Sequence, residues 1–147
     1  EIRHILDNFE FGAKRGENIK AKALLERLNE LYLVTKHQQR NQPLESAILH
    51  LEHVLPQKYH NVSYWTEQWK PDEASEWMHR LGNLALLNQK VNSKIGNGSF
   101  DQKKDHIGKS PYPLTNQIST NYTSWNVESV KKQHTEILKL ANEVWNL

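Results

Sequence analysis

The sequence lacks cysteine altogether, since none of its 147 residues carries a thiol. Disulfide bonds, cysteine-based zinc ribbons and thiol nucleophiles are therefore excluded. It also lacks any apolar run near the ~20 residues of a membrane-spanning helix, so we expect no membrane partner and a soluble, cytoplasmic domain. The net charge is only +2, from 19 basic and 17 acidic residues, and does not by itself indicate a nucleic-acid partner.

Aromatic residues compensate for a hydrophobic content of only 37%. Five Trp, five Tyr and three Phe each bury a large area, and the length is that of one ordinary domain with a sizeable core. The chain begins at Glu1 rather than at a methionine. We therefore expect a single domain, residues 1–147, cut from the C-terminal part of a longer protein.

Apolar residues recur at helical spacing in several segments. They predict a short helix that ends at Gly12, a longer one over residues 17–36, one from Pro71 to about Gly82, and a long terminal helix capped by Ser124 or Asn126. Shorter helices are predicted from a cap at Asn88 through Lys94 and from a cap at Ser99 through Ile107. Residues 35–43 and 111–113 are predicted to be loops.

The run over residues 48–54 is apolar and strand-like, yet it contains His50, Glu52 and His53. Titratable side chains in such a run are costly to bury unless they bind or react with something. Pro56 cannot continue a central strand, so it ends the element. Glu52 and His53 are therefore expected at a strand end, where neighbouring residues can converge on one site.

A second apolar segment, residues 83–87, also has the length of a strand. It is the predicted antiparallel partner of residues 48–54. The fold class is therefore α+β, a mainly helical domain that encloses a small two-stranded core. We divide it into helical N-terminal support (1–43), the core region (44–107), and a loop with the C-terminal helix (108–147).

Several short motifs together resemble one nuclease family. They are Glu52-His53-Val-Leu-Pro-Gln, Gly82-Asn83-Leu-Ala-Leu-Leu, Asn92-Ser-Lys, and Asn97-Gly-Ser-Phe followed by Lys103. In their joint spacing they are similar to the HNH (His-Me finger, ββα-metal) nucleases, specifically the C-terminal HNH domain of GmrSD-type modification-dependent restriction endonucleases. The resemblance spans roughly residues 45–147 and implies that the two-stranded core is a ββα-metal core.

This resemblance implies one divalent ion, Mg²⁺ or Mn²⁺, and a role for each of four residues. His53 matches the histidine that takes a proton from the attacking water, and its titration near neutrality suits that task. Glu52 and Asn92 match the two metal ligands, and oxygen donors are what such ions prefer. Asn83 matches the residue whose side chain fixes the neighbouring loop and so orients the base.

Other polar residues near the motifs are candidates for supporting roles. His50 shares a strand face with Glu52 and is a candidate for contact with the ion or its water shell, although a structural role fits equally well. Asn88 and Asn97 lie close to Asn92 in sequence and are alternatives to it as a ligand.

Basic residues cluster in the second half of the chain. Lys94, Lys103 and Lys104 are candidate phosphate contacts, or else part of a solvated face. The histidines without a spacing argument, which we interpret as structural, are His60, His79, His106 and His134.

The resemblance implies a metal-dependent DNA endonuclease that nicks one strand per event within an anti-phage restriction system. It also implies an upstream nucleotide-binding sensor domain, in the same chain or a partner chain, that detects modified DNA such as glucosylated or phosphorothioated DNA. Two alternatives stay open. One is a non-catalytic DNA-binding or interaction module whose HNH site has decayed, and the other is an RNase built on the same core.

Overall fold

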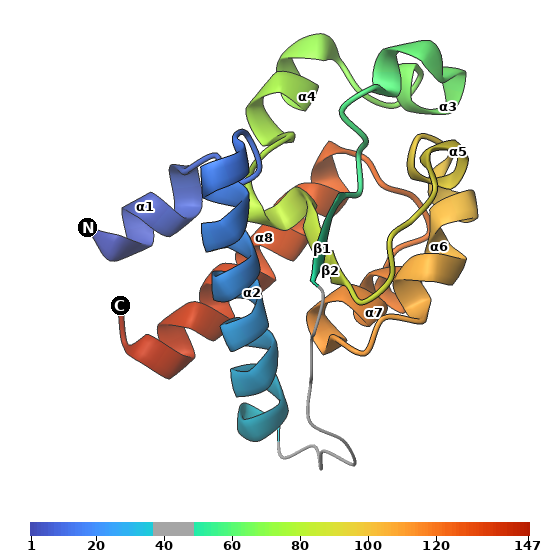
Figure 1. Ribbon diagram of the computed structural model, residues 1–147. Coiled ribbons are helices and arrows are strands. Elements are labelled where there is room, and N and C mark those ends of the chain that lie inside the picture. The colour runs from blue at the N-terminus through green and yellow to red at the C-terminus, as the bar shows by residue number, and fades with distance from the viewer. Residues whose placement is uncertain (37–48) are drawn as a thin grey trace.

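The computed structural model describes residues 1–36 and 49–147. Its elements are α1 (Ile2–Asn8), α2 (Arg15–Thr35), β1 (His50–His53), η1 (Tyr59–Asn61), α3 (Ser63–Thr66), α4 (Pro71–Trp77), η2 (Leu81–Asn83), β2 (Leu84–Leu87), α5 (Ser93–Gly96), α6 (Phe100–Gly108), α7 (Pro113–Asn121) and α8 (Val127–Trp145). Helices surround one small sheet (Figure 1). This is the mainly helical α+β architecture that the sequence predicts.

The sheet consists of β1 and β2, paired antiparallel. Glu52 lies opposite Ala85 and His53 lies opposite Leu84, which confirms the predicted pairing. All four residues of β2 are buried, because α2 and α7 both pack against this strand. In Figure 1, α2 lies on one side of the sheet, and α5, α6 and α7 lie on the other. The end of β1 is therefore held among helices from both halves of the chain.

Two hydrophobic cores meet at the sheet. Successive residues of a strand point to opposite faces of the sheet. Ala85 therefore belongs to one core, while Leu84 and Leu86 belong to the other. The first core is aromatic: Trp69 donates its indole N–H to the carbonyl of Trp125 at 2.8 Å. The second core is mostly leucine and lies between α1, α2 and α8.

Side-chain caps begin two of the helices, as predicted. The Ser99 hydroxyl accepts a hydrogen bond from the N–H of Gln102 at 3.3 Å at the start of α6. Asn126 Oδ1 accepts one from the N–H of Ser129 at 3.0 Å, and this decides between the two predicted caps of α8. Each cap satisfies a backbone donor that the first turn of a helix leaves unpaired.

The helix predicted from Asn88 through Lys94 is wrong in position. The helix there is α5, which starts only at Ser93, and Asn92 caps it with Oδ1 accepting from the N–H of Ile95 at 3.1 Å. Asn88 and Asn92 are equally good caps by residue type. The chain leaves β2 through a bend and an irregular segment, and this path decides which of them is used.

Helix α7 is not predicted from the sequence, where only a loop is expected at residues 111–113. Its Thr, Asn and Ser residues are weak helix formers. Hydrogen bonds to other elements hold it: Asn29 Oδ1 accepts from the N–H of Leu114 at 2.8 Å, and Thr115 Oγ1 accepts from the N–H of Leu86 at 2.9 Å.

The loop predicted over residues 35–43 lies, from residue 37 onward, outside the described residues. Within residues 1–36 and 49–147, no helix has both the length and the apolar character that a membrane crossing requires.

Candidate active site

A pocket of about 280 Å³ opens where β1 ends and the turn after α5 passes it. The residues that line it are Leu51, Glu52, His53, Pro56, Gln57, Lys58, Gly96 and Asn97. Consecutive strand residues point to opposite faces, so Glu52 and His53 would diverge in mid-strand. They line one pocket because the pocket lies at the end of β1, and the position of Pro56 predicts that the strand ends there.

Asn83 fixes the backbone that follows His53. Its side chain is completely buried, and its Oδ1 accepts from the N–H of Leu55 at 2.8 Å and from the indole N–H of Trp125 at 2.9 Å. Its Nδ2 donates to the carbonyls of Leu55 at 3.1 Å and Met78 at 2.9 Å. All four hydrogen-bonding positions of the amide are used, so the turn after β1 has one well-defined conformation.

His53 is only 8% exposed, and both of its ring nitrogens have neighbours. Nε2 lies 3.1 Å from Nδ1 of His79, and Nδ1 lies 3.4 Å from Nε2 of Gln57. Burial lowers the pKa of His53 to about 4, with smaller contributions from the charges of His79 and Lys103. The imidazole is therefore neutral at neutral pH. When the Gln57 amide donates to Nδ1, the ring hydrogen sits on Nε2 and points to His79.

Gly12 brings the α1–α2 connection against the back of His53. Its N–H donates to the carbonyl of His79 at 2.9 Å. A Cβ at this position would lie 2.7 Å from His53 Nε2 and 2.9 Å from Leu84 Cδ2. Only glycine allows this approach, and the N-terminal part of the chain thereby helps to set the orientation of the imidazole.

Glu52 forms an ion pair with a buried lysine. The Lys103 ammonium lies 2.8 Å from Glu52 Oε1 and also donates to the carbonyls of His53 at 2.7 Å and Val54 at 2.8 Å. Burial lowers the pKa of Lys103, and the Glu52 carboxylate opposes that shift. The side chain is 1% exposed and its three N–H groups are all engaged. This placement differs from the phosphate contact that we expect from the sequence.

The other predicted residues lie around the pocket rather than in it. Asn92 is exposed and caps α5, whereas Asn97, its alternative, lines the pocket. His50 is partly buried at the far end of β1, opposite Leu87. Lys94 is exposed, and the Lys104 ammonium lies 5.2 Å from the centre of the Phe100 ring.

His79 makes a contact with the site that is not predicted from the sequence. Nothing in its spacing relates it to His53, so the sequence indicates only a structural role. The two imidazoles meet because the turn between α4 and η2 folds back over the end of β1, with ring centroids 5.1 Å apart. Gln57 belongs to the motif that begins at Glu52, and its contact with His53 gives it a physical role.

Glu52 gives the pocket one oxygen donor of the kind that divalent ions bind. Among the described residues, no group of three or more His, Cys, Asp or Glu is arranged to hold a metal. Glu52 and Asn97 are among the residues that line the pocket. Few protein ligands, all of them oxygen atoms, fit Mg²⁺ or Mn²⁺, which keep several waters, whereas zinc sites favour nitrogen and sulfur.

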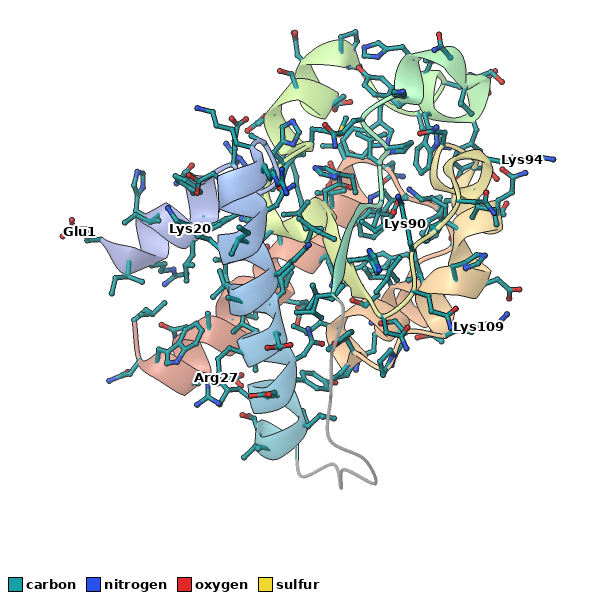
Figure 2. All side chains as sticks on the ribbon, in the orientation of Figure 1. Glu1, Lys20, Arg27, Lys90, Lys94 and Lys109 are labelled. Atoms are coloured by element: carbon teal, nitrogen blue, oxygen red, sulfur yellow. The ribbon has the colours of Figure 1, made fainter. Side chains whose placement is uncertain are left out.

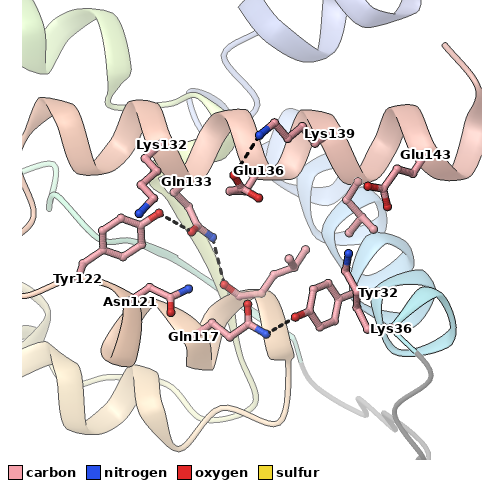
Figure 3. A pocket seen from close by; sticks show the side chains of 12 residues that line it. Tyr32, Lys36, Gln117, Asn121, Tyr122, Lys132, Gln133, Glu136, Lys139 and Glu143 are labelled. Atoms are coloured by element: carbon pink, nitrogen blue, oxygen red, sulfur yellow. Dashed lines mark hydrogen bonds and ion pairs between the residues drawn. The ribbon is translucent and has the colours of Figure 1, made fainter.

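A second cavity, of about 340 Å³, lies between α2, α7 and α8 (Figure 3) and shares no residue with the first. Its central polar groups satisfy one another: the Tyr122 hydroxyl donates to Gln133 Oε1 at 3.1 Å, and Gln117 Nε2 donates to the Tyr32 hydroxyl at 2.6 Å. Burial raises the pKa of Tyr122 to about 12, so its phenol stays protonated.

Comparisons with curated proteins and with solved structures return no match. A scan against family models matches residues 2–140 to the C-terminal domain of the GmrSD restriction endonucleases. The match covers nearly the whole chain and includes the pocket with Glu52 and His53. The protein therefore belongs to the family of GmrSD restriction endonuclease C-terminal domains.

Proposed function

We propose that this domain is a metal-dependent DNA endonuclease that nicks one strand, with His53 as the general base. Family membership indicates a nuclease of a restriction system, with DNA as the substrate. The observation that carries the finer proposal is the neutral imidazole of His53, which is held in a pocket beside the carboxylate of Glu52. A base next to a metal-binding carboxylate is the minimum that water attack on a phosphodiester requires.

His53 takes the proton from water through Nδ1, because its Nε2 faces His79 and Gly12. A pKa of about 4 keeps the base unprotonated, but it is low for efficient proton transfer at neutral pH. A phosphodiester bound in the pocket would raise the pKa of His53 through its negative charge, and a divalent ion held there would oppose that shift. Asn83 holds the turn after His53 and so keeps the imidazole in place.

Glu52 and one asparagine would hold the divalent ion, which when bound supplies positive charge to the reacting phosphate and to the leaving 3′ oxygen. Asn97 and Asn92 are both proposed for the amide ligand. Asn97 lines the pocket, and Asn92 matches the family spacing but caps α5. His50 is proposed at most as a contact to the water shell, because it lies at the opposite end of β1.

DNA would approach over α5 and α6. Figure 2 shows Lys94 and Lys109 pointing outward on this side of the molecule, and Lys90 is also exposed. Lys58 lines the pocket itself. We propose Lys58, Lys94 and Lys104 as phosphate contacts. Because the net charge is only +2, we expect weak DNA binding that falls steeply with salt, and an upstream sensor domain that adds affinity and detects modified DNA.

A plasmid assay tests this proposal. Supercoiled plasmid is incubated with the chain in Mg²⁺, Mn²⁺ or EDTA, and a structured RNA is run in parallel. Metal-dependent open-circle product, lost in His53→Ala and kept in His4→Ala, is the expected result. His4 is a matched control because it is exposed on α1 and its side chain bonds to the neighbouring Asn8.

Activity that survives in His53→Ala would contradict the assignment of the base. Cleavage of the RNA but not of the plasmid would replace the DNA endonuclease with an RNase. No product with either metal, on modified and unmodified plasmid alike, would contradict catalysis by this domain alone.

A further inference from the structure

Lys103 is the most deeply buried charge in the described part of the chain. It sits on the inward face of α6, and its side chain is 1% exposed. Long charged side chains are almost never fully buried unless they are paired. Its three acceptors are one carboxylate oxygen of Glu52 and the two successive carbonyls of His53 and Val54.

The identity of these acceptors separates Lys103 from an ordinary structural ion pair. One ammonium holds the proposed metal ligand and the backbone of the proposed base at the same time. It binds only Oε1 of Glu52, and within residues 1–36 and 49–147 Oε2 has no hydrogen-bonding partner. One oxygen of the carboxylate is thereby held by Lys103, and the other is left for a cation.

We propose that Lys103 is a positioning residue of the nuclease, which restricts Glu52 to a single metal-binding oxygen and fixes the backbone of His53. This inference rests on the proposed function. The fixed positive charge also has a cost for metal binding, because it repels a divalent cation held by the same carboxylate. Lys103 therefore favours correct geometry at the expense of affinity for the ion.

The proposal predicts that removing the charge of Lys103 raises the affinity for Mn²⁺ but lowers the nicking rate. Lys103→Met removes the charge and frees both oxygens of Glu52. We expect the variant to bind Mn²⁺ about tenfold more tightly than the wild type, because one nearby positive charge is gone. We expect it to nick DNA about a hundredfold more slowly, because a displaced ligand or base loses that much rate. Removing a lysine that lies far from the ion would not raise Mn²⁺ affinity.

The experiment measures Mn²⁺ affinity by titration followed with electron paramagnetic resonance, and nicking by the plasmid assay. Four proteins are compared: the wild type, Lys103→Met, Lys103→Gln and Glu52→Gln. Lys103→Gln is shorter than lysine and keeps two N–H donors, so it avoids overpacking. Lys20→Met is the control, because it removes the same charge from an exposed position on α2. Thermal unfolding shows that each variant is folded.

Each outcome decides the proposal. Tighter Mn²⁺ binding with slower nicking in a folded Lys103 variant supports it, and Glu52→Gln should lose Mn²⁺ binding. Unchanged or weaker Mn²⁺ binding in both folded variants contradicts it. Failure of both variants to fold also contradicts it, because Lys103 would then be required by the fold itself. A wild type that binds Mn²⁺ through Glu52 but cuts no DNA would refute the nuclease while leaving the effect of Lys103 on the metal measurable.

Discussion

Two buried histidines, His53 and His134, differ in how closely their ring nitrogens are bound by neighbouring groups. Burial lowers the pKa of both. His134 Nδ1 accepts from the N–H of Gly82 at 3.0 Å, and Nε2 lies 3.0 Å from the carbonyl and 3.1 Å from Oδ1 of Asp7. Both nitrogens of His134 are therefore committed to short bonds that tie α8 to η2 and to α1.

The region of His53 leaves one nitrogen available. Its Nδ1 has only a 3.4 Å contact with Gln57, and it faces a pocket that also holds Glu52. A cavity of about 440 Å³ borders His134 as well, so neither a cavity nor a lowered pKa distinguishes the two residues. What distinguishes them is the length of the contacts: Nδ1 of His53 has only the 3.4 Å contact with Gln57, whereas both nitrogens of His134 have partners at 3.0–3.1 Å. Perturbed titration marks a functional site only when the geometry agrees.

The largest expected contrast comes from removing each imidazole. His53→Ala should reduce the nicking rate by roughly 10² to 10⁴, because a general base is lost. His134→Ala should leave the rate of the folded protein within about twofold of wild type and lower the unfolding free energy by about 1–3 kcal/mol, because buried partners are left unpaired. Nicking assays and urea unfolding of both variants measure the contrast. Equal rate losses in the two would show that His53 has no special role.

Acid should destabilise the protein through these same residues. The pKa of His53 is about 4 in the folded protein, against 6.5 for an unperturbed histidine, so between these values the unfolded chain binds more protons. Stability attributable to His53 is full above pH 6.5, falls as the pH falls, and is lost by about pH 4. The loss amounts to about 3 kcal/mol.

Urea unfolding at pH 7 and at pH 4.5 checks this pH dependence, with His53→Gln as the comparison. The unfolding free energy of the variant should differ less between the two pH values than that of the wild type. The difference that remains includes the contribution of His134. If His53→Gln keeps the full difference, another group controls the acid transition.

Glycines next to the two histidines provide a third contrast. Gly12→Ala places a Cβ 2.7 Å from His53 Nε2, whereas Gly82→Ala places one 2.6 Å from His134 Cβ and 2.7 Å from the carbonyl of Val130. Both should cost about 1–3 kcal/mol of stability, with Gly82→Ala the larger because backbone must move. Only Gly12→Ala should also slow the cleavage step of the folded protein, by about tenfold to a hundredfold. Single-turnover nicking at a temperature where both variants are folded checks this.

The smallest expected effects separate Asn92 from Asn97 within the His53 region. Asn92→Ala should lower the unfolding free energy by about 1 kcal/mol, the usual loss when a helix cap is removed. Asn97→Ala should leave stability nearly unchanged and weaken Mn²⁺ binding. Thermal unfolding and Mn²⁺ titration of the pair would assign the amide ligand. Weaker Mn²⁺ binding in Asn92→Ala alone would restore the assignment that follows from the family spacing.

Local signals account for the parts of the fold that are predictable from the sequence. The strands β1 and β2, which lie within the predicted segments 48–54 and 83–87, and the caps Ser99 and Asn126 follow from rules that act within a few residues. The start of α5 and the existence of α7 do not follow. Asn29 and Thr115 hold α7 from distant parts of the chain, where propensity alone favours a loop.

The sequence by itself determined the chemical inventory of the site: a carboxylate and an imidazole side by side before a proline, and an asparagine at the start of the second strand. Only the tertiary structure decided how these groups are used. His79 meets His53 across 26 residues, and Lys103 meets the His53 carbonyl across 50. Contacts over such separations depend on how helices pack around the sheet, and this packing determines the partners of the imidazole and the burial of the lysine.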